Sequence, residues 1–503
     1  MMLDADLYSV QEVRNCLSQA KEAQAKLAAF SQEQVDAIIA AMSKAGEEAA
    51  HRLAALAVEE TGFGNVPDKR TKNWFAAKQV YEAIKDQKTV GLIGKDAESK
   101  VWEVAQPVGI VAGIVPSTNP TSTVIFKSLI ALKAGNAIIF SPHPSAAACT
   151  REAARVMAEA AVRAGAPEGL IHCITQPTLQ ATQELIGHKL TDLILATGGT
   201  AMVKAAYSSG KPAYGVGPGN VPVYIHHTAE VGLAAKRIVQ SKTFDYGTIC
   251  ASEQALVVDE AIQRQVIAAL QREGAYFLSE QEKEKIASVI MKNGALNAAI
   301  VGRSPQVIAE LAGIKIPADT RVLIGEETQV GKAFPLSVEK LSPILAFYTV
   351  QDWREGAKRC RELLELGGLG HTLGIHAQDE AVITAFGLAQ PASRIVVNTG
   401  TTFGGIGATT GILPSLTLGC GSFGNNITSD NIGPQHLFNR KRIAFGIREM
   451  PAAQKEDTAD TAASAKVEPK PAGQAVSTLQ GGLSREEIKE IIKAVLVDMS
   501  AKP

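Results

Sequence analysis

Short apolar runs alternate with amphipathic stretches along most of the chain, and this alternation predicts an α/β protein. Residues 108–115 are all apolar or glycine, which is typical of a strand buried on both faces of a parallel sheet. Pro116 ends this run, and a helical pattern follows over 123–134. Further strands are expected at 137–140, 171–174 and 193–196. Such a series predicts a doubly wound parallel sheet, which binds ligands at the carboxyl ends of its strands.

The pattern also predicts a helix near the start of the chain and a second α/β region after residue 253. The helix is expected over 31–60, because Ser31 and Gln34 fit a capping box and Gly62 lies just beyond its end. In the second region the expected strands are 254–258, 299–301, 344–348, 373–376 and 395–398, and the expected helices are 260–272, 280–293 and 353–366.

The character of the chain changes near Pro451. Residues 451–482 contain no aromatic side chain and few large apolar ones, so a flexible linker is expected there. A helical pattern returns at 483–503, where Ser484 and Glu487 fit a capping box and an apolar stripe follows. A helix this short is marginal alone in water, so it is expected to bind a groove or a partner helix. The alternative is that it folds back on its own domain.

Composition excludes several classes of protein. With 503 residues, two or three domains are expected. The formal net charge of −1 and the 5% of aromatic residues argue against a nucleic-acid partner or an anionic membrane surface. No apolar run approaches the roughly 18 residues of a membrane span. The six cysteines include no C-x-x-C pair, so neither a disulfide framework nor a metal site is expected. The N-terminus lacks a signal-peptide pattern, and a cytoplasmic location is expected.

The segment 243–254 places Cys250 in a polar loop with glycine and threonine, just before an apolar run. A thiol is a strong nucleophile, and backbone amides gathered around it stabilise its thiolate. A buried structural cysteine is the alternative, since free cysteines are among the most buried residues. The polar flanks favour the nucleophile.

Seven further motifs accompany this loop. They are Pro-Ser-Thr-Asn-Pro at 116–120, Phe-Ser-Pro-His-Pro-Ser at 140–145, Thr-Gly-Gly-Thr at 197–200, Gly-Val-Gly-Pro-Gly-Asn at 215–220, Glu-Lys-Leu-Ser-Pro at 339–343, Gly-Gly-Leu-Gly-His-Thr at 367–372, and Leu-Gly-Cys-Gly-Ser-Phe-Gly-Asn at 418–425. With these motifs the chain, from about residue 30 to about residue 450, resembles an aldehyde dehydrogenase. It most resembles the CoA-acylating branch, the propionaldehyde dehydrogenases of bacterial microcompartments.

The resemblance implies a Rossmann-type cofactor domain, an α/β catalytic domain and an oligomerisation β-hairpin. It implies that Cys250 attacks the aldehyde and that Asn119, with the Cys250 backbone N–H, holds the oxyanion. The residues implied to contact the cofactor are Ser141, His143, Thr197, Gly198, Gly199, Thr200 and Glu339. NAD is the expected cofactor. NADP is also open, because Pro144 stands where the family usually has a carboxylate that repels a 2′-phosphate.

One residue of the hydrolytic family members is missing here. They keep a glutamate that activates water against the thioester, and the matching segment 214–220 contains no carboxylate. Water has a pKa of about 15.7 and needs a base, whereas a thiol ionises about seven units lower. The sequence therefore predicts coenzyme A as the acyl acceptor and propionaldehyde or a similar short-chain aldehyde as substrate. His371 is either a buried, hydrogen-bonded histidine or a residue that handles CoA and the acyl thioester.

Three rival interpretations stay open: a hydrolytic aldehyde dehydrogenase, a cysteine acyltransferase without a redox step, and a shell-binding scaffold without activity. A carboxylate from elsewhere, such as Glu253, would favour the first. The resemblance also implies a dimer or tetramer, and a C-terminal helix that docks on shell proteins inside a bacterial microcompartment. The expected divisions are a cofactor domain at 1–222 with a bridging strand near 100–106, a catalytic domain at 223–420, a return to the cofactor domain with an oligomerisation strand (near 440–447) at 421–450, a linker at 451–482 and a targeting helix at 483–503.

Overall fold

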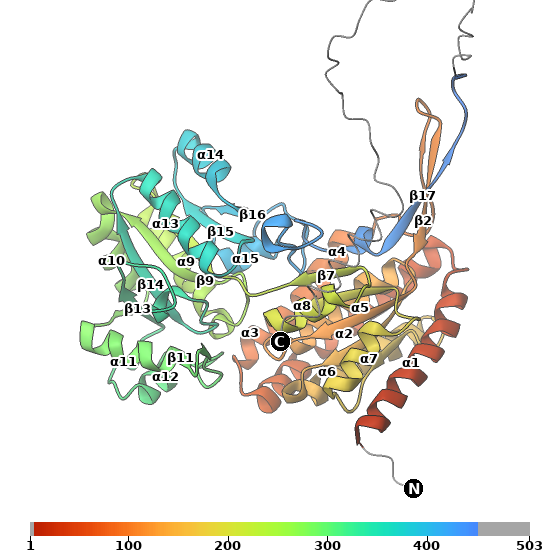
Figure 1. Cartoon of the computed structure of the whole chain (residues 1–503), viewed down its shortest axis with the longest axis horizontal. Coiled ribbons are helices and arrows are strands. Elements are labelled where there is room, and N and C mark those ends of the chain that lie inside the picture. The colour runs from red at the N-terminus through yellow and green to blue at the C-terminus, as the bar shows by residue number, and fades with distance from the viewer. Residues whose placement is uncertain (1–4, 451–503) are drawn as a thin grey trace, which may run out of the picture. The chain divides into compact units, whose positions relative to one another are not determined.

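The computed structural model describes residues 5–450, and the predicted linker and C-terminal helix lie outside this range. Two parallel sheets and one small antiparallel sheet organise these residues (Figure 1). In the first sheet the strand order is β5-β4-β3-β6-β7, with every adjacent pair parallel. Its strands are β3 (Ile110–Val115), β4 (Ala137–Pro142), β5 (Ile171–Cys173), β6 (Leu193–Thr197) and β7 (Ala213–Val216). In chain order this is 3-2-1-4-5, the order of a dinucleotide-binding sheet without its sixth strand, and it confirms the predicted doubly wound sheet.

Eight α-helices accompany the first sheet. They are α1 (Ala5–Leu27), α2 (Gln32–Thr61), α3 (Val66–Trp74), α4 (Val80–Ile84), α5 (Pro120–Lys133), α6 (Ala147–Arg163), α7 (Leu179–Gly187) and α8 (Thr200–Ser208), with a π-helical turn at Phe75–Gln79 between α3 and α4. The predicted capping box of α2 is present, and Gly62 ends that helix in the left-handed conformation. Every residue of α5 is buried. The Lys127 ammonium of α5 is satisfied by the carbonyls of Ile114 and Leu195, at 2.7 and 2.8 Å.

The second sheet has the order β10-β13-β14-β9-β8-β15-β16, again with parallel neighbours. Its strands are β8 (Val221–Ile225), β9 (Glu253–Asp259), β10 (Ala275–Phe277), β13 (Val322–Glu326), β14 (Ile344–Val350), β15 (Gly370–His376) and β16 (Ala392–Val397). Its helices are α9 (Val231–Thr243), α10 (Gln263–Arg272), α11 (Glu280–Ile290), α12 (Pro305–Leu311), α13 (Trp353–Leu366), α14 (Glu380–Ala389) and α15 (Thr401–Gly405).

Two predictions for this region were wrong. The strand expected at 299–301 is a turn, although Ile300 and Val301 are buried. Their apolar character therefore reflects burial rather than strand pairing. The helix expected to reach residue 293 ends at Ile290, where a small hairpin of β11 (Met291–Lys292) and β12 (Ala295–Leu296) begins.

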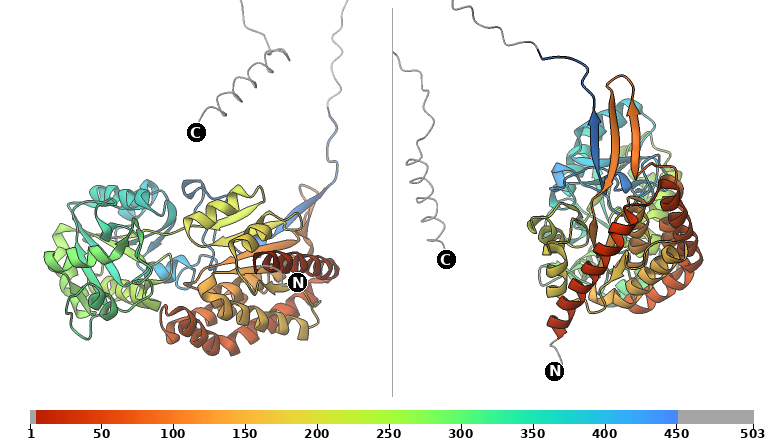
Figure 2. Two further views of the ribbon diagram at one scale, coloured as in Figure 1. Left: turned by 60° about the horizontal axis from the view of Figure 1, so that its bottom comes forward. Right: turned by 90° about the vertical axis from the view of Figure 1, so that its right-hand side faces the viewer.

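The third sheet joins distant parts of the chain in the antiparallel order β1-β2-β17 (Figure 2). Its strands are β1 (Gly91–Asp96), β2 (Val101–Pro107) and β17 (Phe438–Ala444). It contains the two strands expected near 100–106 and 440–447, and adds β1. The chain passes from the first parallel sheet to the second between β7 and β8, so the expected domain boundary at residue 222 falls inside β8. Among the described helices, none is both long and apolar enough to cross a membrane.

Candidate active site

A cavity of about 520 Å³ lies where the carboxyl ends of the first sheet face segments that lead into the second. From the first sheet it is lined by the ends of β3, β4 and β6, and from the second by the Cys250 loop before β9 and by residues before β8 and β14. It brings together eight of the predicted site residues: Asn119, Ser141, His143, Thr197, Gly198, Gly199, Cys250 and Glu339. Thr200 is the first residue of α8, directly after this group. His371 does not line the cavity.

Cys250 follows a loop with an uncommon backbone. Asp245 and Tyr246 have φ of 49° and 51°, and Gly247 has φ of 74°. This left-handed run turns the chain sharply between α9 and β9. Burial, and after it the nearby Glu339 carboxylate, raise the pKa of the Cys250 thiol to about 12, although the Arg394 guanidinium opposes them. In this structure the thiol is therefore protonated at neutral pH.

Asn119 precedes α5 but does not cap it, so its carboxamide is available for other contacts. The Nδ2 group donates to Thr118 Oγ1 at 3.1 Å and to the carbonyl of Thr248 at 3.3 Å. The second contact joins Asn119 to the loop two residues before Cys250. The Oδ1 atom accepts a hydrogen bond from Lys72 Nζ at 2.5 Å. The amide predicted to hold an oxyanion thus lies beside the predicted nucleophile.

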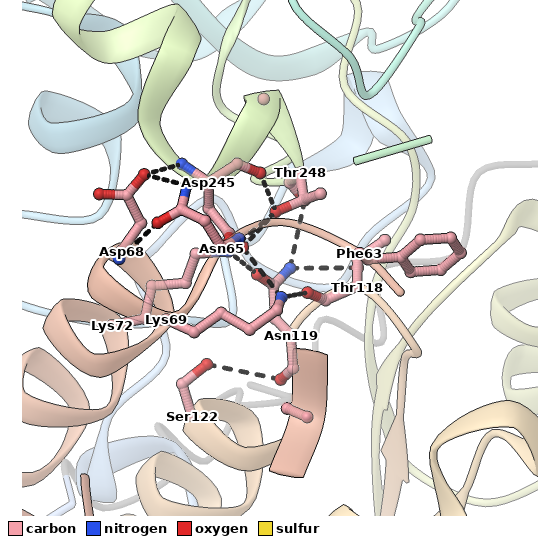
Figure 3. A network of polar contacts seen from close by, with 12 residues as sticks. Phe63, Asn65, Asp68, Lys69, Lys72, Thr118, Asn119, Ser122, Asp245 and Thr248 are labelled. Carbon is pink, nitrogen blue, oxygen red and sulfur yellow. Dashed lines mark hydrogen bonds and ion pairs between the residues drawn. The ribbon is translucent and has the colours of Figure 1, made fainter. Parts of the chain in front are cut away.

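A polar cluster that was not predicted from the sequence surrounds this amide (Figure 3). Lys69 and Lys72 of α3 both pair with the fully buried Asp245. We call Lys69, Lys72, Asp245 and Thr248 the Asp245 cluster. Since α3 is otherwise polar, two lysines three residues apart look like an ordinary solvated face. Only the fold reveals that both are buried.

At the other end of the cavity, several features suit a dinucleotide. Gly199 caps α8 without a side-chain hydrogen bond, and a Cβ built at Gly199 would have nothing within 4 Å. A helix N-terminus in this state is a ready site for a phosphate. Thr197 Oγ1 is buried and has no hydrogen-bond partner in the described residues. Ser141 Oγ, in contrast, already bonds Thr182 Oγ1 at 2.8 Å, and His143 Nδ1 bonds Ser145 Oγ at 2.8 Å.

Glu339 is the one carboxylate among the described residues that line the cavity. Its Oε1 accepts a hydrogen bond from the Gly219 backbone N–H at 2.9 Å. Burial raises the pKa of Glu339 to about 7, while the Gly219 N–H and the ammonium groups of Lys242 and Lys340 oppose this. Near neutral pH the charge of Glu339 is therefore sensitive to whatever binds in the cavity.

The segment that lacks the hydrolytic glutamate lies directly against Cys250. A Cβ built at Gly219 would lie 2.2 Å from the Cys250 carbonyl oxygen and 3.2 Å from Cγ of His371, so only glycine fits there. Asn220 fixes the end of the segment by donating to the carbonyls of Ser337 and Leu363, at 2.8 and 2.9 Å. This side of Cys250 is formed by backbone.

His371 is completely buried behind Gly219. Its Nδ1 bonds Thr372 Oγ1 at 3.0 Å, and its Nε2 has no partner within the described chain. Burial and the nearby Arg394 lower the pKa of His371 to about 3. The ring is therefore neutral.

Glu253, considered above as a candidate general base for hydrolysis, forms hydrogen bonds to other groups. Its carboxylate accepts from Ser241 Oγ at 2.8 Å and from the Thr401 backbone N–H at 2.6 Å. Burial raises the pKa of Glu253 despite these bonds. Glu253 is not among the residues that line the cavity.

One group of described side chains has the composition of a metal site: His226, His227 and Asp259, with ligand atoms within 4.8 Å of one another. It lies where β8 and β9 end, whereas Cys250 lies where β9 begins. Asp259 already accepts from Tyr224 Oη at 2.5 Å and from the His227 backbone N–H at 2.9 Å, and its Oδ2 lies 3.0 Å from His227 Nδ1. These bonds satisfy the carboxylate without an ion, and the group does not belong to the cavity.

Comparison with known families agrees with this geometry. A model described as "Aldehyde dehydrogenase family" matches residues 2–293, more than half of the chain. The chain belongs to the aldehyde dehydrogenase family. A crystal structure of an acetylating aldehyde dehydrogenase from Geobacillus thermoglucosidasius shares 67% sequence identity and has a TM-score of 0.89, covering 90% of this chain and 100% of that one.

Other aldehyde dehydrogenases are similar at greater distance. The bifunctional aldehyde-alcohol dehydrogenase AdhE of Escherichia coli (strain K12) is 47% identical over 441 residues, 87% of this chain and 50% of that protein. The chain thus spans about half the length of this curated relative. The propionaldehyde dehydrogenase of the Clostridium phytofermentans fucose utilisation bacterial microcompartment is 29% identical with a TM-score of 0.78, covering 86% of this chain and 97% of that one. Two further structures are each 26% identical with a TM-score of 0.77. One is an engineered glycolyl-CoA reductase with bound NADP+, and the other is a Rhodopseudomonas palustris propionaldehyde dehydrogenase with bound propionyl-CoA.

Proposed function

We propose that this aldehyde dehydrogenase is CoA-acylating and oxidises a short-chain aldehyde with CoA and NAD+ to acyl-CoA and NADH. The observation that carries the proposal is that Gly217 and Gly219 present only backbone toward Cys250, in a segment, 214–220, that contains no carboxylate. The similarity to an acetylating aldehyde dehydrogenase supports it. In this proposal the first parallel sheet carries the cofactor and the second carries the nucleophile.

The first chemical step forms a carbon–sulfur bond at Cys250. The thiol gives its proton to solvent water, the thiolate sulfur attacks the aldehyde carbonyl carbon, and the C=O π electrons move to the oxygen, which becomes an oxyanion. Asn119 Nδ2 and the Cys250 backbone N–H would donate to that oxyanion. Because Nδ2 now bonds Thr118 Oγ1 and the Thr248 carbonyl, it would exchange the longer of these contacts for the oxyanion.

The cofactor would bind from the α8 end of the cavity to Cys250. The uncapped start of α8 at Gly199 and Thr200, with Gly198, would hold its phosphates, and the free Thr197 Oγ1 would donate to or accept from it. Ser141 and His143, which line the cavity, would contact the adenosine ribose, and Glu339 would contact the nicotinamide ribose. The nicotinamide, when bound, supplies the acceptor for the hydride that leaves the thiohemiacetal carbon.

The thioester that remains on Cys250 is then removed by the thiol of CoA rather than by water. A thiol with a pKa of about 8.5 is partly ionised at neutral pH, whereas water is not, and segment 214–220 contains no carboxylate that could activate it. Glu339, the carboxylate beside Gly219, is bound to the Gly219 backbone N–H. We propose that His371, whose neutral Nε2 has no partner among residues 5–450, contacts CoA or the acyl group after a small movement of Gly219.

The decisive experiment omits CoA from the assay. The expected result is a single burst of about one NADH per active site, as the thioester accumulates, followed by no turnover until CoA is added and acyl-CoA appears. Continuous NADH formation without CoA, with a free acid as product, would refute the proposal in favour of hydrolysis. A protein that transfers acyl groups from Cys250 but neither binds nicotinamide cofactor nor forms NADH would be an acyltransferase. A protein that docks on shells without activity would be a scaffold.

Substrate and cofactor preferences are part of the proposal. We propose aldehydes of two to four carbons, with propionaldehyde among them, and NAD+ in preference to NADP+. No carboxylate among the described residues faces the His143 end of the cavity, so a 2′-phosphate would meet no repulsion and NADP+ should also be accepted. Values of kcat/KM for three aldehydes and both cofactors test these points. A preference for NADP+ would contradict the second.

Assembly and location are also proposed from the resemblance. The small sheet and the residues directly after β17 expose several large apolar side chains, and exposed apolar surface marks an interaction site. Those with at least 44% of their surface exposed are Leu92, Ile443, Phe445 and Ile447. We propose that this sheet forms the dimer or tetramer interface. Light scattering tests this proposal.

We also propose that 483–503 directs the enzyme into a bacterial microcompartment. Fusing 483–503 to a reporter in shell-containing cells tests this second proposal.

A further inference from the structure

The Asp245 cluster joins helix α3 to both the Cys250 loop and Asn119. The Lys72 ammonium has three N–H groups and three acceptors: Asn119 Oδ1 at 2.5 Å, Thr248 Oγ1 at 2.9 Å, and Asp245 Oδ2 (Figure 3). Because all three donors are used, the position of the ammonium is fixed. Its side chain is 3% exposed, so solvent does not compete for these bonds.

Charges in and around the cluster balance. Lys69 and Lys72 are opposed by Asp245 and by Asp68, whose Oδ2 accepts from the Asp245 backbone N–H at 2.7 Å. Asp245 itself also accepts from the Asn65 backbone N–H at 2.9 Å and from Thr248 Oγ1 at 2.7 Å. A buried charge without a partner is costly, and here each has one.

Asn119 has an orientation problem that this cluster solves. Rotating a carboxamide by 180° exchanges its oxygen and its NH₂ group, and only the NH₂ group can donate to an oxyanion. The wrong orientation would present an acceptor to the developing negative charge. An ammonium has no acceptor, so Lys72 can pair only with Oδ1 and thereby excludes that orientation. The cation also polarises the amide and strengthens Nδ2 as a donor.

We propose that Lys72 is a positioning residue that fixes the oxyanion-binding orientation of Asn119, with Asp245 holding Lys72 in place. The inference rests on the proposed function only in requiring an oxyanion at Cys250, whichever nucleophile later removes the thioester. Lys69 provides a contrast within the same cluster. It pairs with Asp245 at 2.9 Å and with the Thr118 carbonyl at 3.0 Å, and it has no contact with Asn119.

A double-mutant cycle on the full-length protein tests this inference. The variants are K72M, N119A and K72M/N119A, and the readout is kcat for NADH formation with saturating aldehyde, cofactor and CoA. K72M should lower kcat by about 10- to 100-fold, somewhat less than the loss of the donor itself, and leave KM for the aldehyde within about threefold. In the N119A background the same substitution should lower kcat by less than about twofold, because its target is gone. Equal losses in both backgrounds would overturn the inference.

K69M is the matched control, because it removes a neighbouring ammonium that does not touch Asn119. Whatever K69M costs in kcat, the cost should be the same with and without Asn119, and coupling as large as that of K72M would overturn the inference. If K72M does not fold, K72M/D245N removes one charge of each sign and keeps the balance. It should fold and show the same loss of kcat, and full activity in it would overturn the inference. Wild-type product analysis is independent of the cycle: a free acid would refute the acylating function while leaving the cycle interpretable.

Discussion

Two walls face Cys250, and they differ in what they are made of. On one side Asn119 is held by the Asp245 cluster, a buried network of charged side chains. On the other side Gly219 lies so close to the Cys250 carbonyl that there is no room for a Cβ atom, and the neutral His371 ring lies behind it. We call Gly217 and Gly219 the glycine wall and the side of Asn119 the charged wall. One wall can stabilise charge that develops on an oxygen. The other offers close approach, and its own segment, 214–220, contributes no base.

The difference assigns the two halves of the reaction to different walls. Formation of the thioester needs fixed donors, and fixed donors need rigid support, which the cluster supplies. Removal of the thioester needs a nucleophile that brings its own ionised atom, because the glycine wall cannot deprotonate one. The preference for CoA over water as acyl acceptor then arises because the glycine wall has no carboxylate to activate water.

Removing the atom between the walls should have the largest effect. Cys250→Ala should lower NADH formation by at least about 10³-fold, because no covalent intermediate can form. The control is Cys420→Ala, since Cys420 is a buried thiol outside the cavity. Turnover near the wild-type rate in the Cys250 variant would refute both proposed steps, the formation and the removal of a thioester on Cys250.

Breaking the charged wall should come next. Asn119→Ala should lower kcat by about 10²- to 10³-fold, the usual cost of one oxyanion donor. Asn119→Asp has the same size but puts a negative charge where the donor was, so it should be at least as damaging. An aspartate variant more active than the alanine variant would contradict the role of Nδ2.

The thiol itself can be probed by pH. With its pKa raised to about 12 by burial and by Glu339, Cys250 is below its pKa throughout the working range. Its thiolate fraction, and hence its rate of alkylation by iodoacetamide, should rise about tenfold for each pH unit from 7 to 9, roughly 100-fold in all. An ordinary thiol would level off near pH 8.5. Mass spectrometry of the labelled peptide, with Cys250→Ala as the blank, distinguishes the two.

Converting the glycine wall should have the smallest, but most specific, effect. A Cβ built at Gly217 meets nothing within 4 Å, and Gly217 lines the cavity. Gly217→Glu should therefore fit and raise CoA-independent turnover by about tenfold through general-base activation of water. Gly217→Gln has the same size without a base and should not. Equal rates in the two variants would show that a missing carboxylate is not what suppresses hydrolysis.

The sequence predicted the first wall only in part. Asn119 and Cys250 were singled out because their motifs are distinctive and because apolar runs next to them, 108–115 and 255–258, predict strands. Lys72 was missed because its burial is a property of the tertiary structure: the helix that carries it is polar, and its partner Asp245 lies 173 residues further on. Residues 299–301 illustrate the opposite error, since an apolar run there is buried without joining a sheet.

The glycine wall was easier to predict, because absence of a carboxylate can be seen directly in 214–220. What the sequence did not reveal is why Gly219 must be glycine. That requirement comes from the Cys250 carbonyl and the His371 ring, which approach it from two other segments of the chain. His371 itself could be noticed but not placed, since its contact with Gly219 depends on how β15 packs beside β8.

The small antiparallel sheet has a consequence for synthesis of the protein. Strand β2 is paired on one side by β1, close in sequence, and on the other by β17, whose Arg440 contacts Glu103 at a sequence separation of 337 residues. On a ribosome the second edge of β2 therefore stays open until residue 444 has emerged, long after the first parallel sheet can form. An open strand edge invites pairing between nascent chains. Translation that pauses or stops before β17 should therefore yield chains that aggregate through β2, although their nucleotide-binding sheet is complete.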